Sequence, residues 1–322
     1  MKTDAMKSTR SITEFLKKYN TYLMLVICLV ICMTISPDFF TLTNLLNISR
    51  QYASLTVVSM GMLLVIATGG IDLSVGSYLA CGSVLVAIFI NLGMGLLPAV
   101  LLALALGVIS GTVTGVLVAE FKMPAFIVTM AMMTIIRGTA FILSNGSPIR
   151  TPSNTISQLG QNSIAGIPLL LILALAVIAI FAFILTRTSF GRIVLATGSN
   201  ESCVRLSGIR VNYYIIAVYA ISALCATLGG IMAASRTGIG TPLYGEGLEL
   251  DAIAACVIGG ASLSGGTGSA VKTVVGVLVL ALIGNIMNLL SVPSYPQDVI
   301  KGLIIIASVL IQIFTSSKKE SA

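Results

Sequence analysis

Ionisable side chains of the kind that catalysis needs are scarce in this chain. Its 322 residues include no histidine, which removes the most common general base and the most common metal ligand. The carboxylates within apolar surroundings are few: Asp72, Glu246, Glu249 and Asp251. They do not form a paired acid–base motif, and no nucleophile motif accompanies them. We therefore predict no catalytic residue, no metal site and no cofactor bound by this chain.

A glycine-rich stretch from Gly265 to Thr273 resembles a phosphate-binding loop. That motif requires a glycine directly before its lysine, whereas Val271 stands before Lys272. No other stretch of the sequence fits a nucleotide site. If ATP drives this protein, another subunit has to bind it.

The composition indicates whether the chain folds in water or in lipid. Hydrophobic residues make up 57% of it and charged residues only 9%, whereas soluble domains carry about 25% charged residues. The apolar residues come in runs of about twenty, the length that crosses a hydrocarbon core of roughly 30 Å. We predict an all-α integral membrane protein in a lipid bilayer.

The apolar runs predict about ten transmembrane helices, one of which is short and either spans or re-enters. They form a transmembrane domain, 21–315, between a basic N-terminal segment, 1–20, and a tail, 316–322. An even number of crossings places both termini on one side. The runs cover residues 21–36, 51–68, 74–91, 96–119, 124–144, 167–186, 213–235, 250–261, 270–290 and 297–315.

Basic residues are concentrated in three places along the sequence. Five precede the first apolar run, four lie in the hydrophilic loop 187–212, and Lys318 and Lys319 close the chain. Basic residues accumulate on the cytoplasmic side of membrane proteins, so both termini and this loop are predicted to be cytoplasmic. This pattern explains the net charge of +7 without a nucleic-acid partner.

Two glycine-rich stretches, 69–76 and 259–266, resemble each other at an offset of 190 residues. Extended to Val84 and Val274, the comparison gives seven identities in sixteen positions. Weak internal duplication is common in transporters, and glycine-interrupted segments at matching places indicate the pathway. The alternative is that glycine, leucine and serine are simply frequent in membrane helices.

Gly107, Gly111 and Gly115 form a row of small residues on one helix face, which allows close approach of a neighbouring helix. Packing within the chain and contact with a second copy both fit this row.

Arg137 is the one basic residue deep in an apolar run. A charge there usually faces protein or water, and the alternatives are a shorter helix or snorkelling to the outer interface.

The hydrophilic loop contains the signals of a short helix. Asn200 can cap a helix from Glu201 to Leu206, and Gly208 can end it. Such a helix is either a plug for a groove on a partner protein or part of a solvated linker.

Four motifs together resemble the permease subunits of bacterial ABC importers for monosaccharides, with the ribose, galactose and xylose systems most similar. The resemblance runs from about residue 36 to 315 and is specific for the family but not for the sugar. The motifs are Thr68–Ser77, Asn145–Ile149, Ser207–Ile209 and Glu249–Ala255.

The resemblance implies a permease pair in the bacterial inner membrane, formed as a homodimer or with a paralogue. It also implies an ABC ATPase subunit below and a periplasmic solute-binding protein above. The loop Thr188–Val211 would carry the coupling helix that enters the ATPase cleft, although Ser199, Ser202 and Cys203 depart from the family pattern. The residues expected to couple to the ATPase are Asn200, Glu201, Arg205, Ser207 and Gly208.

Further roles follow from the same resemblance. Arg150 and Arg236 are expected at the periplasmic face, where they would meet acidic residues of the binding protein. For each serine of the pathway, a hydroxyl that bonds its own helix backbone is the alternative. The residues expected to line or gate the translocation pathway are Asp72, Ser74, Arg137, Ser262 and Ser264.

The expected function is passage of a monosaccharide, ribose-like in the first place, without covalent chemistry. Another small polyhydroxyl solute, such as a signal of the autoinducer type, fits the sequence as well. An ion-driven secondary sugar transporter would need ion sites near the midplane, and the few intramembrane acids disfavour it. An intramembrane enzyme has still less support without histidine.

Overall fold

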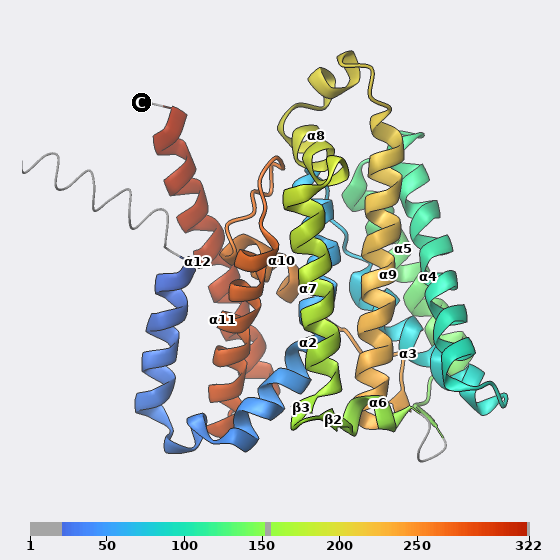
Figure 1. The fold of residues 1–322 in the computed structure, drawn as a ribbon, viewed down its shortest axis with the longest axis vertical. Coiled ribbons are helices and arrows are strands. Elements are labelled where there is room, and N and C mark those ends of the chain that lie inside the picture. The colour runs from blue at the N-terminus through green and yellow to red at the C-terminus, as the bar shows by residue number, and fades with distance from the viewer. Residues whose placement is uncertain (1–20, 152–155, 321–322) are drawn as a thin grey trace, which may run out of the picture.

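The computed structural model describes residues 21–151 and 156–320 of the chain. Long helices stand side by side, and the two ends of the bundle differ (Figure 1). One end carries α8 (Ser189–Leu206), and the opposite end carries α6 (Ser157–Gln161) with the paired strands β2 (Ser163–Ile164) and β3 (Ile167–Pro168). We refer to the first of these as the α8 end.

Each apolar run predicted from the sequence coincides with one helix, although some helices extend beyond their runs. The basic segment 1–20 and the last two residues of the tail lie outside the described residues, while 316–320 continue the last helix. The helices are Thr21–Ile35, α2 (Leu42–Ala67), α3 (Val75–Asn91), α4 (Leu96–Ala119), α5 (Ala125–Ser144), α7 (Leu169–Arg187), α9 (Val211–Thr237), α10 (Leu248–Ile258), α11 (Ala270–Leu289) and α12 (Ser294–Glu320), with a 3₁₀ turn at Pro37–Phe40.

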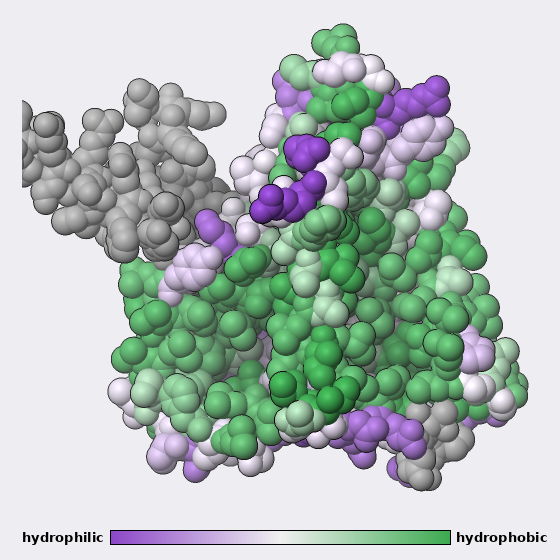
Figure 2. Space-filling model, viewed as in Figure 1, coloured by the Kyte–Doolittle hydropathy of each residue, from purple (hydrophilic) through white to green (hydrophobic). Residues whose placement is uncertain are grey.

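The helices have the lengths and the surface of a membrane protein. Among the described helices, six are long and apolar enough to cross a bilayer: α2, α4, α5, α7, α9 and α11. Large apolar side chains such as Leu97, Ile109 and Ile142 are exposed on α4 and α5. Figure 2 shows a broad apolar zone over the middle of one face, with hydrophilic side chains gathered at the α8 end and at the opposite end. The apolar zone matches the part of a bundle that faces lipid.

Helix α2 begins nine residues before the apolar run that predicted it. The Thr41 hydroxyl caps it by accepting a hydrogen bond from the Asn44 amide at 3.3 Å. The side-chain amides of Asn44 and Asn285 exchange two hydrogen bonds, of 3.0 and 2.7 Å. Because polar residues are interspersed with leucines in the first two turns of α2, these turns do not form a continuous apolar run, and hydropathy alone misses them.

Helix α9 lies at the centre of the bundle, between α2, α3 and α4. The glycine row of α4 faces it: Gly107 packs on Thr227, Gly111 on Ala223, and Gly115 on Ile216. A Cβ at any of the three glycines would come too close to α9, which explains the small residues. The row packs within the chain.

The two similar glycine stretches both form a tight turn between two helices. In each, two backbone amides close the preceding helix in the same pattern, at a positive-φ glycine, Gly69 or Gly260. The turns match at an offset of 191, one residue more than the sequence comparison, and the second turn is longer. The bonds run from Gly69 to Ile66, from Gly70 to Val65, from Gly260 to Val257 and from Ala261 to Cys256.

Between α9 and α10 the chain is largely irregular, from residue 238 to 247, and pairs only briefly as β4 (Ile239–Gly240) with β1 (Ile149–Arg150). Thr241 in this segment is buried and bonded to Ser83 of α3, with the Thr241 amide 3.1 Å from the Ser83 hydroxyl. Helix α10 has 11 residues, about 16 Å, which is too short to cross a membrane. Irregular backbone followed by a half-length helix inside the bundle is typical of transporters.

Candidate translocation and coupling site

Helix α8 is two short helices joined at a kink. The backbone of Asn200 leaves the helical region, with φ −161° and ψ 94°. Its side-chain oxygen accepts a hydrogen bond from the Cys203 amide at 3.0 Å, so Asn200 caps the second helix. Gly208, with φ +81°, follows the end of that helix. The stretch before Asn200 is helical as well, although the sequence analysis treated it only as part of a basic loop.

The second half of α8 stands out from the bundle at its tip (Figure 1). Glu201 and Arg205 form an ion pair of 2.6 Å, and the Arg205 guanidinium also donates to the Asn212 side chain at 2.6 Å. Leu206, the last residue of the helix, is 87% exposed. An apolar side chain that projects from a polar tip, away from the lipid-facing zone, is suited to a pocket on another protein.

The first half of α8 packs against both glycine turns. Gly266 donates its backbone amide to the Ala67 carbonyl at 3.0 Å, which joins the end of α2 to the second turn. Gly198 lies against the same two groups, and a Cβ there would overlap both of them. A Cβ at Gly265 would lie 2.8 Å from Gly198 Cα and 2.8 Å from the Gly69 nitrogen. The end of α2, the first half of α8 and the second glycine turn are therefore in direct backbone contact at this point.

We call this contact the glycine joint and define it by three segments: Ala67–Gly69, Gly198–Ser199 and Gly265–Gly266. Its three segments come from α8 and from the two similar turns. Because α8 touches both turns directly, a displacement of α8 acts on both of them together.

Asp72 organises the first turn from inside the protein. It is 1% exposed, and its carboxylate accepts hydrogen bonds from the Ser74 amide at 3.0 Å, from the Ser74 hydroxyl, and from the Ser222 hydroxyl at 2.8 Å. The hydroxyl of Thr129 on α5 donates to the neighbouring Ile71 carbonyl at 3.2 Å. The turn is thus fixed to α9 and to α5, and Asp72 is not open to solvent in this conformation.

Arg137 holds the irregular segment before α10. Its Nη1 donates to the backbone carbonyls of Pro242 and Tyr244, both at 2.6 Å. A Cβ at Gly76 of α3 would overlap the Gly245 carbonyl of the same segment. The segment therefore contacts both α5 and α3, and the charge of Arg137 is used inside the chain rather than at the outer interface.

The serines predicted for the pathway fall into two groups. Ser74 is buried and donates to Asp72, not to the backbone of its own helix. Ser262 and Ser264 lie in the second glycine turn, where the Ser262 hydroxyl accepts from the Ser264 amide at 3.2 Å. The structure brings Ser262 and Ser264 near the glycine joint, and it places Arg137 elsewhere.

Arg150 and Arg236 lie at the end opposite to α8. Arg236 is in the last turn of α9, which at 27 residues separates its two ends by roughly 40 Å. Arg150 is on β1, which pairs with β4 just after α9. Both side chains are exposed. This end therefore carries two accessible positive charges.

Ser222 and Gly198 belong to this arrangement but were not predicted from the sequence. Ser222 lies 150 residues from its partner Asp72, and a single serine in an apolar run carries no signal of its own. Gly198 was only one of several glycines in a basic loop. Three-dimensional contacts were needed to find both.

Comparison with known proteins gives a consistent result. The model of a family described as branched-chain amino acid transport system, permease component, matches residues 44–309. A ribose import permease protein of Escherichia coli (strain K12) is 40% identical over 317 residues, which cover 97% of this chain and 98% of the relative. A ribose import permease protein of Bacillus subtilis (strain 168) is 38% identical over 97% of this chain and 98% of the relative.

An L-arabinose transport system permease protein of Escherichia coli (strain K12) is 36% identical over 317 residues, or 98% of this chain and 97% of the relative. No solved structure matches the chain.

Proposed function

Since this chain belongs to the family of branched-chain amino acid transport system permease components, we propose that it forms the membrane path of an ATP-driven importer for a monosaccharide. The assignment of a sugar as the substrate rests on similarity along nearly the whole chain to permeases named for ribose and for L-arabinose. The chain is a transport subunit and not itself an enzyme. Any ATP hydrolysis belongs to a separate subunit.

The substrate class we propose is a pentose, with ribose first. Ribose and L-arabinose are both pentoses, and the two ribose permeases are 40% and 38% identical to this chain, against 36% for the L-arabinose permease. These identities are close together, so direct competition between the two sugars decides between them.

We propose that the ATPase docks on the second half of α8, through Asn200, Glu201, Arg205, Ser207 and Gly208. The capped helix, its ion pair and the exposed Leu206 side chain form a rigid projection of the kind that fits a groove. The glycine joint then connects this projection to both glycine turns. A movement of the ATPase would be transmitted to Asp72 and α10 through the backbone contacts of this joint.

The α8 end would face the cytoplasm. The loop 187–212 carries four arginines. Lys122, between α4 and α5, and Lys272, in the first turn of α11, lie at the same end, which agrees with the cytoplasmic preference of basic residues. The opposite end, with Arg150 and Arg236, would then receive the periplasmic binding protein. Two copies of the chain would form the permease pair in the inner membrane.

The experiment that tests this proposal is purification of the tagged chain from bacterial membranes in mild detergent, with mass spectrometry and an ATPase assay of what co-purifies. We expect a nucleotide-binding subunit, and ATP turnover that rises when a ribose-loaded binding protein is added. A chain that purifies alone under several detergents would contradict the proposal and would favour an ion-driven carrier.

A further inference from the structure

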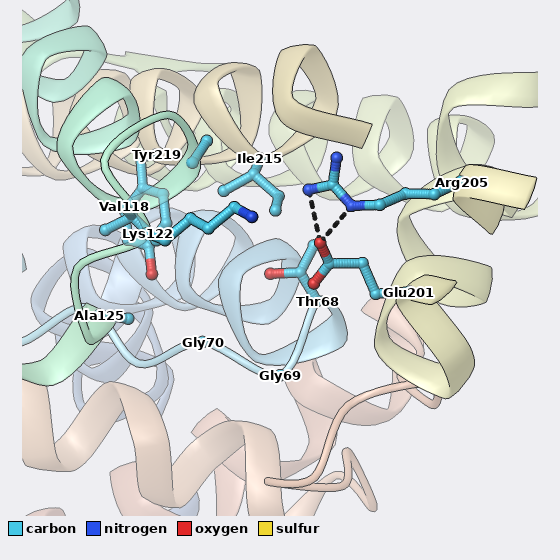
Figure 3. A pocket seen from close by; sticks show the side chains of 11 residues that line it. Thr68, Gly69, Gly70, Val118, Lys122, Ala125, Glu201, Arg205, Ile215 and Tyr219 are labelled. Atoms are coloured by element: carbon cyan, nitrogen blue, oxygen red, sulfur yellow. Dashed lines mark hydrogen bonds and ion pairs between the residues drawn. The ribbon is translucent and has the colours of Figure 1, made fainter. Parts of the chain in front are cut away.

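A pocket of about 370 Å³ lies at the α8 end, beside the first glycine turn (Figure 3). Its walls come from the end of α2 and the turn after it, from the α4–α5 turn, from α9, and from the second half of α8. Pockets of roughly 300–1,000 Å³ hold small organic ligands. The residues that line it are Thr68, Gly69, Gly70, Val118, Ala119, Lys122, Ala125, Glu201, Arg205, Ile215 and Tyr219.

The lining of the pocket includes a polar group that the described residues leave unsatisfied. Tyr219 is 1% exposed, and its hydroxyl has no hydrogen-bond partner among them. The hydroxyl lies against Gly70, where a Cβ would come within 2.6 Å of it. A buried hydroxyl without a partner is unfavourable, so a ligand or water that bonds it is favoured.

The rim of the pocket offers both donors and acceptors. Lys122 extends across the pocket toward Thr68 (Figure 3), and no ion pair to it is found among the described residues. Glu201 provides carboxylate oxygens opposite it, and Arg205 pairs with Glu201. Hydroxyl groups of a sugar can donate to a carboxylate and accept from an ammonium group or a phenol at the same time. An anion would be attracted by Lys122 and Arg205 and repelled by Glu201, whereas a neutral polyol can form hydrogen bonds with both kinds of group.

We infer that this pocket, at the α8 end, binds a small polyhydroxyl solute. It would be an exit site that the sugar occupies after it has crossed the membrane. The inference rests on the proposed function, which supplies the class of solute. Lys122 would donate to the sugar and Glu201 would accept from it, while the Tyr219 hydroxyl, which is buried against Gly70, would donate once the first glycine turn moves away from it. The site would lie directly on the coupling segment and on the first glycine turn, so it would be formed or broken when α8 moves.

The test is saturation-transfer NMR of ribose with the complete permease–ATPase complex in lipid nanodiscs, which avoids detergents that carry sugar head groups. Tyr219→Phe removes only the hydroxyl, and Lys122→Met removes only the charge. Matched controls are Tyr213→Phe, at an exposed tyrosine of the same helix, and Lys272→Met, at the α8 end but outside the pocket. ATP-dependent ribose uptake of the unmodified complex is measured in parallel.

We expect a ribose signal in the unmodified complex, with an affinity that falls about tenfold in each pocket variant, as for the loss of one hydrogen bond, and stays unchanged in both controls. Equal binding in all five proteins, or no binding to a complex that does import ribose, would overturn the inference and leave the proposed function standing. Absence of uptake with ribose and L-arabinose would reject the proposed function and this site with it.

Discussion

At the scale of single residues, the charged groups inside this bundle hold irregular backbone in place. The carboxylate of Asp72 fixes the first glycine turn to α9, and the guanidinium of Arg137 fixes the segment before α10. Hydrogen bonds to charged groups contribute about 1.5–3 kcal/mol each, more than neutral ones. Few charges are therefore needed, and each lies where backbone amides or carbonyls have no hydrogen-bond partner within a regular helix.

Replacing Ser222 with alanine tests the role of Asp72. The substitution removes one of three donors to a buried carboxylate, so we expect a loss of roughly 1–3 kcal/mol and a Tm lower by a few degrees in thermal unfolding of the purified protein. The control is Ser49→Ala, whose hydroxyl donates only to the Leu46 carbonyl of its own helix. Equal Tm values for the two variants would contradict the assignment.

Replacing Arg137 tests the role of the segment before α10. Arg137→Met removes both hydrogen bonds to Pro242 and Tyr244, so the segment should move and ribose uptake should fall at least tenfold. Arg137→Lys keeps a cation with fewer donors and should recover part of the uptake. Uptake in proteoliposomes is the measurement, and an Arg137→Met variant with unchanged uptake would show that this clamp has no part in transport.

At the scale of elements, the contact that matters most is the glycine joint. Alanine normally favours a helix over glycine by about 1 kcal/mol, so Gly198→Ala would stabilise an isolated helix. Here the added methyl group meets the Ala67 carbonyl and the Gly266 amide, which are backbone atoms that cannot turn away. The helix has to shift instead.

We therefore expect Gly198→Ala to leave the ATPase bound but uncoupled. Co-purification should be unchanged, while the stimulation of ATP turnover by the loaded binding protein should fall at least fivefold. The matched control is Gly302→Ala on α12, where a Cβ meets nothing within 4 Å. Full stimulation in the Gly198 variant would show that the joint does not transmit movement.

The elements also show how far sequence reasoning reaches. Ten apolar runs predicted ten helices because hydropathy is a local property, and the cap at Asn200 was predictable because a cap lies within four residues. The beginning of α2 was not predicted because polar residues interrupt the leucines of its first turns. The glycine joint escaped because Ala67, Gly198 and Gly266 are more than sixty residues apart, and no local pattern records which glycine faces which.

At the scale of the whole molecule, the two ends of the bundle have different surfaces for different partners. The α8 end presents a projecting helix, a joint and a pocket. The opposite end presents Arg150 and Arg236 without a comparable projection among the described residues. This polarity suits a protein that receives a solute at one end and energy at the other.

Reversing the charges of Arg150 and Arg236 to glutamate tests the docking proposal. Charges at the rim of an interface mainly change the association rate, so docking of the binding protein should slow by about tenfold at low salt and by less at high salt. Surface plasmon resonance on immobilised nanodiscs measures this rate. Charge reversal at the α8 end, Lys272→Glu, should leave it unchanged, and equal rates for all three proteins would remove these arginines from the docking surface.

The most direct test of the central claim is ATP-dependent uptake of radiolabelled ribose into proteoliposomes that contain this chain, its co-purified ATPase and the loaded binding protein. The account predicts accumulation that requires ATP and is reduced by unlabelled ribose more than by unlabelled L-arabinose. Uptake that proceeds without ATP and follows an ion gradient, or no uptake of either sugar, would contradict it.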